Sequence, residues 1–233
     1  MKPSKNPEPS TSRLSRFLSI LVMLLIPVAL VLTSVRILLT PAFLPIEYSM
    51  PNFPADAYGF TKADRLYWSR FALDYLLNDE GIEFLGDLRF ADSAKVYNER
   101  ELRHMVDVKN AVQAALNVWI VTLGLLVGLG LWAWKGNWMR DYRLGLARGG
   151  RLTAALVIVI IFLVLLSFGV FFVAFHNVFF EAGTWVFNFS DTLIRLFPER
   201  FWRDIFVYVG VISAGLGLLI SYLARYRPQA TGK

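Results

Sequence analysis

Four long apolar segments constrain the fold of this 233-residue chain more than any other feature. A helix needs about 20 predominantly apolar residues to cross the hydrocarbon core of a bilayer, because each residue advances about 1.5 Å and no backbone amide can stay unpaired in lipid. The segments that meet this requirement are 17–39, 111–134, 152–175 and 205–224. The sequence therefore predicts an all-α, polytopic membrane protein with four transmembrane helices.

The basic residues indicate how these helices are oriented. Lys and Arg gather in segments 1–16, 135–151 and 225–233, and an excess of both is typical of the cytoplasmic side of a membrane. We expect both termini and the loop 135–151 to be cytoplasmic. The net charge of +6 then reflects topology, and the sequence gives no support for nucleic-acid binding. Segment 17–39 is too long for a signal peptide and lacks a small-residue cleavage site, which favours an uncleaved signal anchor.

Segment 40–110, between the first two spans, is predicted to form an extracytoplasmic helical cap. Residues 61–78 have the pattern of an amphipathic helix with Thr61 and Asp64 as its cap, whereas four prolines predict an extended conformation for residues 40–60. A second helix is expected to begin at Asn98 and to run without Gly or Pro into the second span.

The chain has only two histidines, and the hydropathy pattern places both at the outer face of the bundle. His104 lies seven residues before Ala111, roughly 10 Å above the second span, and His176 ends the third apolar segment. Because residues three apart share a helix face, Asp107 or Glu101 can orient His104, and an oriented imidazole can act as a general base. The alternatives are a solvated charged face for His104 and an interfacial histidine bonded to a backbone carbonyl for His176.

The loop 176–204 is rich in aromatic residues, which either anchor the protein at the membrane interface or form a wall for acyl chains. Ser190 and Asp191 are expected to start a short helix that ends before Pro198. The chain contains no cysteine, so a thiolate nucleophile is excluded and any chemistry must use oxygen and nitrogen groups.

The strings ELRHMVDVK and FHNVFF, in a four-span protein with a large first external loop, resemble the bacterial lipoprotein intramolecular transacylase (Lit) family. This family is also described as integral membrane proteins of unknown function. The resemblance implies transfer of the sn-2 acyl chain of a lipoprotein's diacylglyceryl group to the α-amine of its N-terminal cysteine, giving a lyso-form lipoprotein. It further implies a multi-pass protein of the bacterial plasma membrane, no cofactor, and diacylated lipoproteins and membrane lipid as partners.

On this model His104 and His176 are the catalytic residues that handle protons, and Asp107 orients His104. Arg103 and Lys109 are candidates for contact with a lipid phosphate or the oxyanion, although bases near a membrane surface usually extend to the headgroups. Glu101, Asp191 and Glu181 are candidate acids that would support the catalytic residues without touching the substrate.

Three other functions remain open on the sequence. His104 and His176 with Asp107 or Glu181 have suitable chemistry for a zinc site, or the two histidines can ligate haem axially, although a depth difference of about 10 Å opposes this. The third alternative is a non-enzymatic membrane scaffold. Glycines in the second and fourth spans would allow close packing within or between chains in such a scaffold, and they are Gly124, Gly128, Gly130, Gly210, Gly215 and Gly217.

Overall fold

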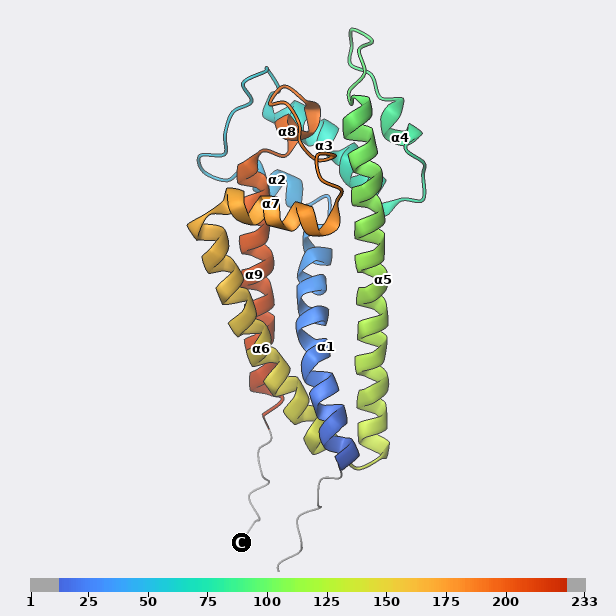
Figure 1. Cartoon of the computed structure of the whole chain (residues 1–233), viewed down its shortest axis with the longest axis vertical. Helices are drawn as coiled ribbons and strands as arrows, with labels where there is room; N and C mark the ends of the chain where they lie inside the picture. The colour runs from blue at the N-terminus through green and yellow to red at the C-terminus, as the bar shows by residue number, and fades with distance from the viewer. Residues whose placement is uncertain (1–12, 226–233) are drawn as a thin grey trace, which may run out of the picture.

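The computed structural model describes residues 13–225, and within that range the chain is helical apart from loops and one isolated bridge (Figure 1). Four helices are long and apolar enough to cross a membrane. They are α1 (Arg13–Leu38), α5 (Glu99–Lys135), α6 (Met139–Leu166) and α9 (Glu199–Leu223). The predicted all-α membrane protein with four spans is confirmed. Segments 1–12 and 226–233, which carry part of the predicted cytoplasmic ends, lie outside the described residues.

Helices α1, α6 and α9 pack closely through small residues. A Cβ atom added to Gly150 would lie 2.1 Å from the carbonyl oxygen of Gly217, and one added to Gly145 would lie 2.6 Å from that of Ser19. Only glycine allows backbones to approach so closely. The hydroxyls of Ser34 and Ser213, 2.8 Å apart, add a buried hydrogen bond between α1 and α9.

Helix α5 is attached to this group much more loosely. Within the most apolar 18 residues of each helix, only 11% are buried inside the protein for α5, against 39% for α1. Gly124 and Gly128, which the sequence suggested for close packing, have no heavy atom within 4 Å of an added Cβ. Most of the apolar surface of α5 therefore faces outward, where lipid would cover it.

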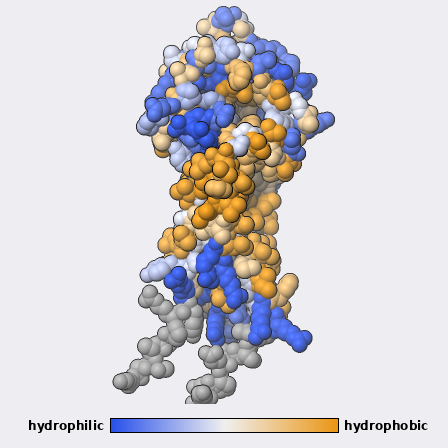
Figure 2. Space-filling model, turned by 60° about the vertical axis from the view of Figure 1, so that its left-hand side comes forward, coloured by the Kyte–Doolittle hydropathy of each residue, from blue (hydrophilic) through white to orange (hydrophobic). Residues whose placement is uncertain are grey.

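A cap closes one end of the bundle, and a band of apolar surface separates it from hydrophilic surface at the other end (Figure 2). It contains α2 (Phe43–Glu47), α3 (Lys62–Leu77), α4 (Glu83–Gly86) and, from much later in the chain, α8 (Thr192–Leu196). Its apolar core joins Tyr75, Leu85 and Tyr97 to Leu196 of α8. Helix α8 thus completes the cap although it lies more than 90 residues further along the chain. For example, the Thr192 hydroxyl donates to the Val96 carbonyl.

Helices α3 and α5 begin at the capping residues that the sequence predicts. Capping boxes join Thr61 to Asp64 at the start of α3 and Asn98 to Glu101 at the start of α5, which confirms both predictions. The extended conformation predicted for residues 40–60 is wrong in part, because α2 lies within it. Pro45 fits this short helix because the N–H that proline lacks would have had no partner in a first turn.

The third apolar segment is divided between two helices, unlike the continuous span predicted at 152–175. Helix α6 begins earlier, inside the predicted loop 135–151, and ends at Leu166; Ser167 then has non-helical angles of φ −157° and ψ 87°. Helix α7 (Phe168–Phe179) runs across the bundle beneath the cap (Figure 1). Edge-to-face contacts of Phe171 and Phe175 with Phe206, at 4.9 and 5.2 Å between centroids, hold α7 against α9.

Candidate active site

The two histidines lie side by side although 72 positions separate them in the sequence. His104 is on α5 and His176 on α7, and their ring centroids are 6.2 Å apart with the ring planes inclined by 21°. The depth difference of about 10 Å expected from the sequence is absent, because α7 crosses the bundle and carries His176 towards α5. The break at Ser167 therefore creates the histidine pair.

One nitrogen of His176 has a fixed partner. Its Nδ1 atom lies 2.8 Å from the carbonyl oxygen of Phe172, one helical turn earlier. A carbonyl only accepts, so Nδ1 must carry the hydrogen and Nε2 of the neutral ring must carry the lone pair. Burial lowers the pKa of His176, although the bond to Phe172 opposes that shift. His176 is thus neutral at pH 7 and presents Nε2 as a proton acceptor.

His104 is held by aromatic rings. It is 8% exposed, and its ring makes edge-to-face contacts with Phe180 at 5.0 Å and Phe187 at 5.3 Å between centroids. Its Nδ1 atom is buried without a hydrogen-bond partner in the described part of the chain. The hydrogen bond predicted from Asp107 is not formed: Asp107 is exposed. A three-residue step turns the helix by about 300°, so the two side chains diverge by about 60°.

A tight turn after α7 brings a third aromatic side chain onto the pair. The Thr184 hydroxyl donates to the Glu181 carbonyl at 2.8 Å, and Gly183 has φ +87°, a conformation that glycine adopts without strain. Trp185 then packs on His176 with 4.7 Å between centroids. The Nε1 atom of Trp185 is buried and has no partner among residues 13–225.

Two of the predicted supporting acids, Glu101 and Asp191, form hydrogen bonds near the histidine pair. Glu101 is 1% exposed and accepts from the backbone N–H of Leu193 at 2.7 Å, which joins α5 to α8. Asp191 accepts from Arg100 at 2.8 Å. Arg100 was not singled out from the sequence, although it precedes His104 by four residues on the same helix face. Its guanidinium lies over Phe187, and its Nε atom is buried with no hydrogen-bond partner in the part of the chain that the structure describes.

The remaining predicted residues point away from the histidines. Arg103 and Glu181 are exposed, and Lys109 donates to Asn78 and to the Glu80 carbonyl at 3.1 and 2.6 Å, which fastens the end of α3 to α5. The structure therefore brings together His104 and His176, and it does not bring Arg103, Lys109 or Glu181 to them.

The donor set does not suit the zinc alternative. Across the described residues, no group of three His, Asp or Glu side chains is placed to hold a metal ion. The two acids proposed as third ligands, Asp107 and Glu181, are both exposed. Two imidazoles are fewer than the three protein ligands that a catalytic zinc site usually has.

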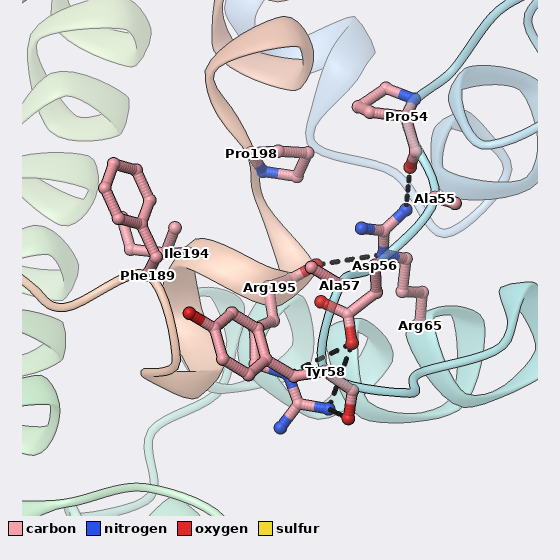
Figure 3. A pocket seen from close by; sticks show the side chains of 10 residues that line it. All are labelled: Pro54, Ala55, Asp56, Ala57, Tyr58, Arg65, Phe189, Ile194, Arg195 and Pro198. Carbon is pink, nitrogen blue, oxygen red and sulfur yellow. Dashed lines mark hydrogen bonds and ion pairs between the residues drawn. The ribbon is translucent and has the colours of Figure 1, made fainter.

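A separate hollow of about 320 Å³ opens on the cap (Figure 3). Arg195 pairs with Asp56 at 3.1 Å there, and Arg65 donates to the Arg195 and Pro54 carbonyls at 2.9 and 2.6 Å. These bonds fasten the loop before α3 to α8. The hollow is lined by neither histidine. It is separate from the rings that surround the two imidazoles, here termed the aromatic recess, which are Phe172, Phe180, Trp185 and Phe187.

The fold and the recess together define a class: a four-span integral membrane protein with two imidazoles paired in an aromatic recess beneath its cap. Residues 20–202 match the family model for lipoprotein intramolecular transacylase Lit. The match covers most of the chain, so the chain belongs to the Lit family and is an acyltransferase of that class.

Solved structures and one further sequence are similar to this chain. The Bacillus cereus membrane integral lipoprotein intramolecular transacylase Lit has a solved structure that is 20% identical, with a TM-score of 0.63 over 90% of this chain and 94% of that chain. A variant of it with one histidine replaced by alanine gives a TM-score of 0.66, with 20% identity over 91% and 93% of the two chains. An uncharacterised Aquifex aeolicus protein is 29% identical, covering 89% of this chain and 93% of its own length. The solved structures share the fold.

Proposed function

We propose that this protein moves the sn-2 acyl chain of a lipoprotein's diacylglyceryl group to the α-amine of the same lipoprotein's N-terminal cysteine, and that His104 and His176 transfer the protons. The observation that carries the proposal is the pairing of the two rings at 6.2 Å in an aromatic recess. Family membership supports the reaction class. The product would be an N-acyl, S-monoacylglyceryl lipoprotein.

The reaction balances without any further reactant. The neutral amine attacks the ester carbonyl carbon, an N–C bond forms, and the C–O bond to glycerol breaks. One proton leaves the nitrogen, and one proton is added to the glyceryl oxygen. Two imidazoles suit these two transfers because their ordinary pKa lies near neutral pH.

The hydrogen bonding of the rings suggests a division of roles. Nδ1 of His176 is engaged by the Phe172 carbonyl, so its Nε2 is the atom to accept the proton of the amine. His104 is neutral because burial and the neighbouring His176 lower its pKa to about 4, and it is then the group that gives the Nε2 proton to the glyceryl oxygen. The proton that His176 took from the amine replaces it in the same relay, so both rings end neutral. Because donor and acceptor belong to one substrate, proximity contributes much of the rate and the enzyme needs no nucleophile of its own.

The surroundings of the recess suit a lipid substrate. Helix α7 exposes apolar side chains beside His176, among them Val173, Val178 and Phe179. Acyl chains can lie against such a surface without leaving the bilayer. The basic start of α6 lies at the opposite end of the bundle, so we propose that the cap faces outward from the bacterial plasma membrane with both termini in the cytoplasm (Figure 1).

The test is mass spectrometry of the N-terminal peptide of a model lipoprotein from a bacterium that lacks its own N-acylating enzymes. The wild-type protein should leave the total acyl mass unchanged and move one chain from glycerol to the amine. His104→Ala and His176→Ala should each lower this product by about 10²- to 10⁴-fold. Asn177→Ala, an exposed neighbour on α7, is the matched control and should keep full activity.

A well-expressed wild-type protein that left the diacylglyceryl form untouched would overturn the proposed reaction. Full activity of either histidine variant would overturn the assignment of the protons. In the first case, visible absorbance of the purified protein would test the haem alternative, and a biological role retained without both histidines would favour the scaffold.

A further inference from the structure

We propose that the indole N–H of Trp185 binds the ester carbonyl oxygen of the substrate and stabilises the oxyanion of the tetrahedral intermediate. This inference rests on the proposed transacylation and adds a donor to it. It assigns to Trp185 a catalytic role that is separate from the proton transfers of the two histidines.

The chemistry requires a donor that the histidine pair does not supply. When the amine attacks, negative charge collects on the carbonyl oxygen, and a donor placed there in advance stabilises the transition state. Nδ1 of His176 already donates to Phe172, its Nε2 accepts the amine proton, and His104 serves the glyceryl oxygen. The carbonyl oxygen therefore needs a third group.

Trp185 is placed to be that group. Its ring packs on His176 with 4.7 Å between centroids, closer than His104 itself at 6.2 Å. The turn that returns Trp185 to His176 is fixed by the Thr184–Glu181 bond and by the positive φ of Gly183. The aromatic ring of Trp185 thus lies against the imidazole that would activate the amine.

The Nε1 atom of Trp185 has a free donor. Indole nitrogen only donates, and it is buried here without a partner in the described residues. A buried tryptophan usually finds a partner, because an unsatisfied N–H costs about 1–3 kcal/mol. A substrate oxygen that enters the recess would recover this cost, which favours binding where the chemistry takes place.

Two other buried donors serve as comparisons. Nε1 of Trp138 is also unpartnered, but its ring contacts Trp132 and Tyr142 near the start of α6, at the end of the bundle away from the histidines. Nε of Arg100 is unpartnered too, but its guanidinium lies 5.7 Å from the Phe187 centroid, and Phe187 contacts His104. Of the three, Trp185 is the one in ring contact with His176.

The kinetic test compares Trp185→Phe with Trp138→Phe, since each variant loses one buried indole N–H and keeps an aromatic ring. Trp185→Phe should lower kcat by about 10²-fold and change KM by less than about threefold. Trp138→Phe should keep wild-type kcat. Trp185→Tyr, which offers an O–H donor, should recover part of the loss.

Equal kcat for the two phenylalanine variants would overturn the proposal. So would a large loss of kcat in Arg100→Gln with none in Trp185→Phe, since that result would assign the oxyanion to the guanidinium. If Trp185→Phe melted far below the wild type, the kinetic test would compare Trp185→Tyr with Trp185→Ala instead. Higher activity of the tyrosine variant would support the donor, and equal activity would overturn it.

A binding measurement separates this inference from the proposed reaction. The probe is a diacylglyceryl-cysteine peptide with an acetylated amine, which carries the ester but cannot accept the acyl chain. Its addition to protein with isotope-labelled tryptophan should shift the indole N–H resonance of Trp185, identified among the seven tryptophans by its loss in a Trp185 variant. If the Trp185 resonance shifted but the protein had no transacylase activity, the indole would be a donor to the ester and the proposed reaction would be rejected. If the resonance did not shift, the role of Trp185 as donor would be rejected even in an active enzyme.

Discussion

The three-helix group α1–α6–α9 and the histidine recess are built in opposite ways. In the first, backbones touch at Gly150 and Gly217, and buried hydroxyls such as those of Ser34 and Ser213 bond to each other. In the recess, bulky rings separate the backbones, and the buried Nε of Arg100, Nδ1 of His104 and Nε1 of Trp185 have no hydrogen-bond partner among residues 13–225. Close packing with satisfied hydrogen bonds makes a rigid frame, whereas unsatisfied donors among rings make a place for a ligand.

The largest effect should follow from disturbing the frame. A Cβ atom in Gly150→Ala would lie 2.1 Å from the carbonyl oxygen of Gly217, so α6 and α9 would have to separate. We expect a loss of about 3 kcal/mol in stability, measured by thermal unfolding in detergent. Gly128→Ala, where an added Cβ meets nothing within 4 Å, is the control and should melt at or above the wild-type temperature. Equal melting of the two variants would contradict the comparison.

A smaller effect should follow where the cap meets the recess. Glu101 accepts from the backbone N–H groups of Asn98 and Leu193, so Glu101→Ala would leave the buried Leu193 donor unsatisfied. We expect a loss of about 2 kcal/mol and faster hydrogen exchange at Leu193. Glu99→Ala removes only an exposed pair with Lys95 and should leave the melting temperature close to that of the wild type. If both variants exchanged alike at Leu193, Glu101 would not be the clamp between α5 and α8.

The protonation state of His176 predicts how the rate of transacylation depends on pH. His176 must be neutral to accept a proton, and burial lowers its pKa from the ordinary value of 6.5. The rate of transacylation should therefore be insensitive to His176 above pH 6.5 and should fall as pH drops below its lowered pKa, by up to about tenfold per pH unit. A rate profile in proteoliposomes measures this. The α-amine of the substrate has an ordinary pKa of about 7.7–8.0 and also lowers the rate when it is protonated, so His176 is expected to add a second fall that begins below pH 6.5. A profile without this second fall would contradict the role of His176 as the proton acceptor.

The smallest effect concerns the orientation of His104. The sequence predicts that Asp107 orients the ring, whereas aromatic contacts hold the ring in the structure and Asp107 is exposed. Asp107→Asn should then change kcat by less than about twofold, while Phe187→Ala should lower it more. A large loss in Asp107→Asn, with Phe187→Ala near wild type, would restore the carboxylate as the orienting group.

The sequence was sufficient for the features that depend on local chemistry. Apolar length identified the membrane helices, and side-chain caps located the starts of α3 at Thr61 and of α5 at Asn98. The position of His104 on an unbroken helix followed from the absence of Gly and Pro between Asn98 and Ala111. These features need no knowledge of what the helices contact.

The remaining features depend on tertiary contacts. Gly169 lies two residues after the break at Ser167, but glycines such as Gly124 and Gly128 also lie inside the continuous helix α5, so a glycine does not by itself locate the break. The rings of Phe171 and Phe175 meet Phe206, which is some 30 residues further along the chain. The sequence could place both histidines near one face but could not show that α7 turns inward. Likewise, the missing partners of Arg100 and Trp185 are properties of the packed recess, which no local pattern encodes.

The unbroken length of α5 has a consequence for the membrane around it. From His104 to Lys135 the helix advances 31 residues, roughly 46 Å, and no kink lets this distance adjust. The ester of a lipid, in contrast, moves up or down with the thickness of the bilayer that holds it. Because the length of α5 is fixed, we expect the rate of transacylation to depend on bilayer thickness, which sets whether the ester lies at the height of the imidazoles.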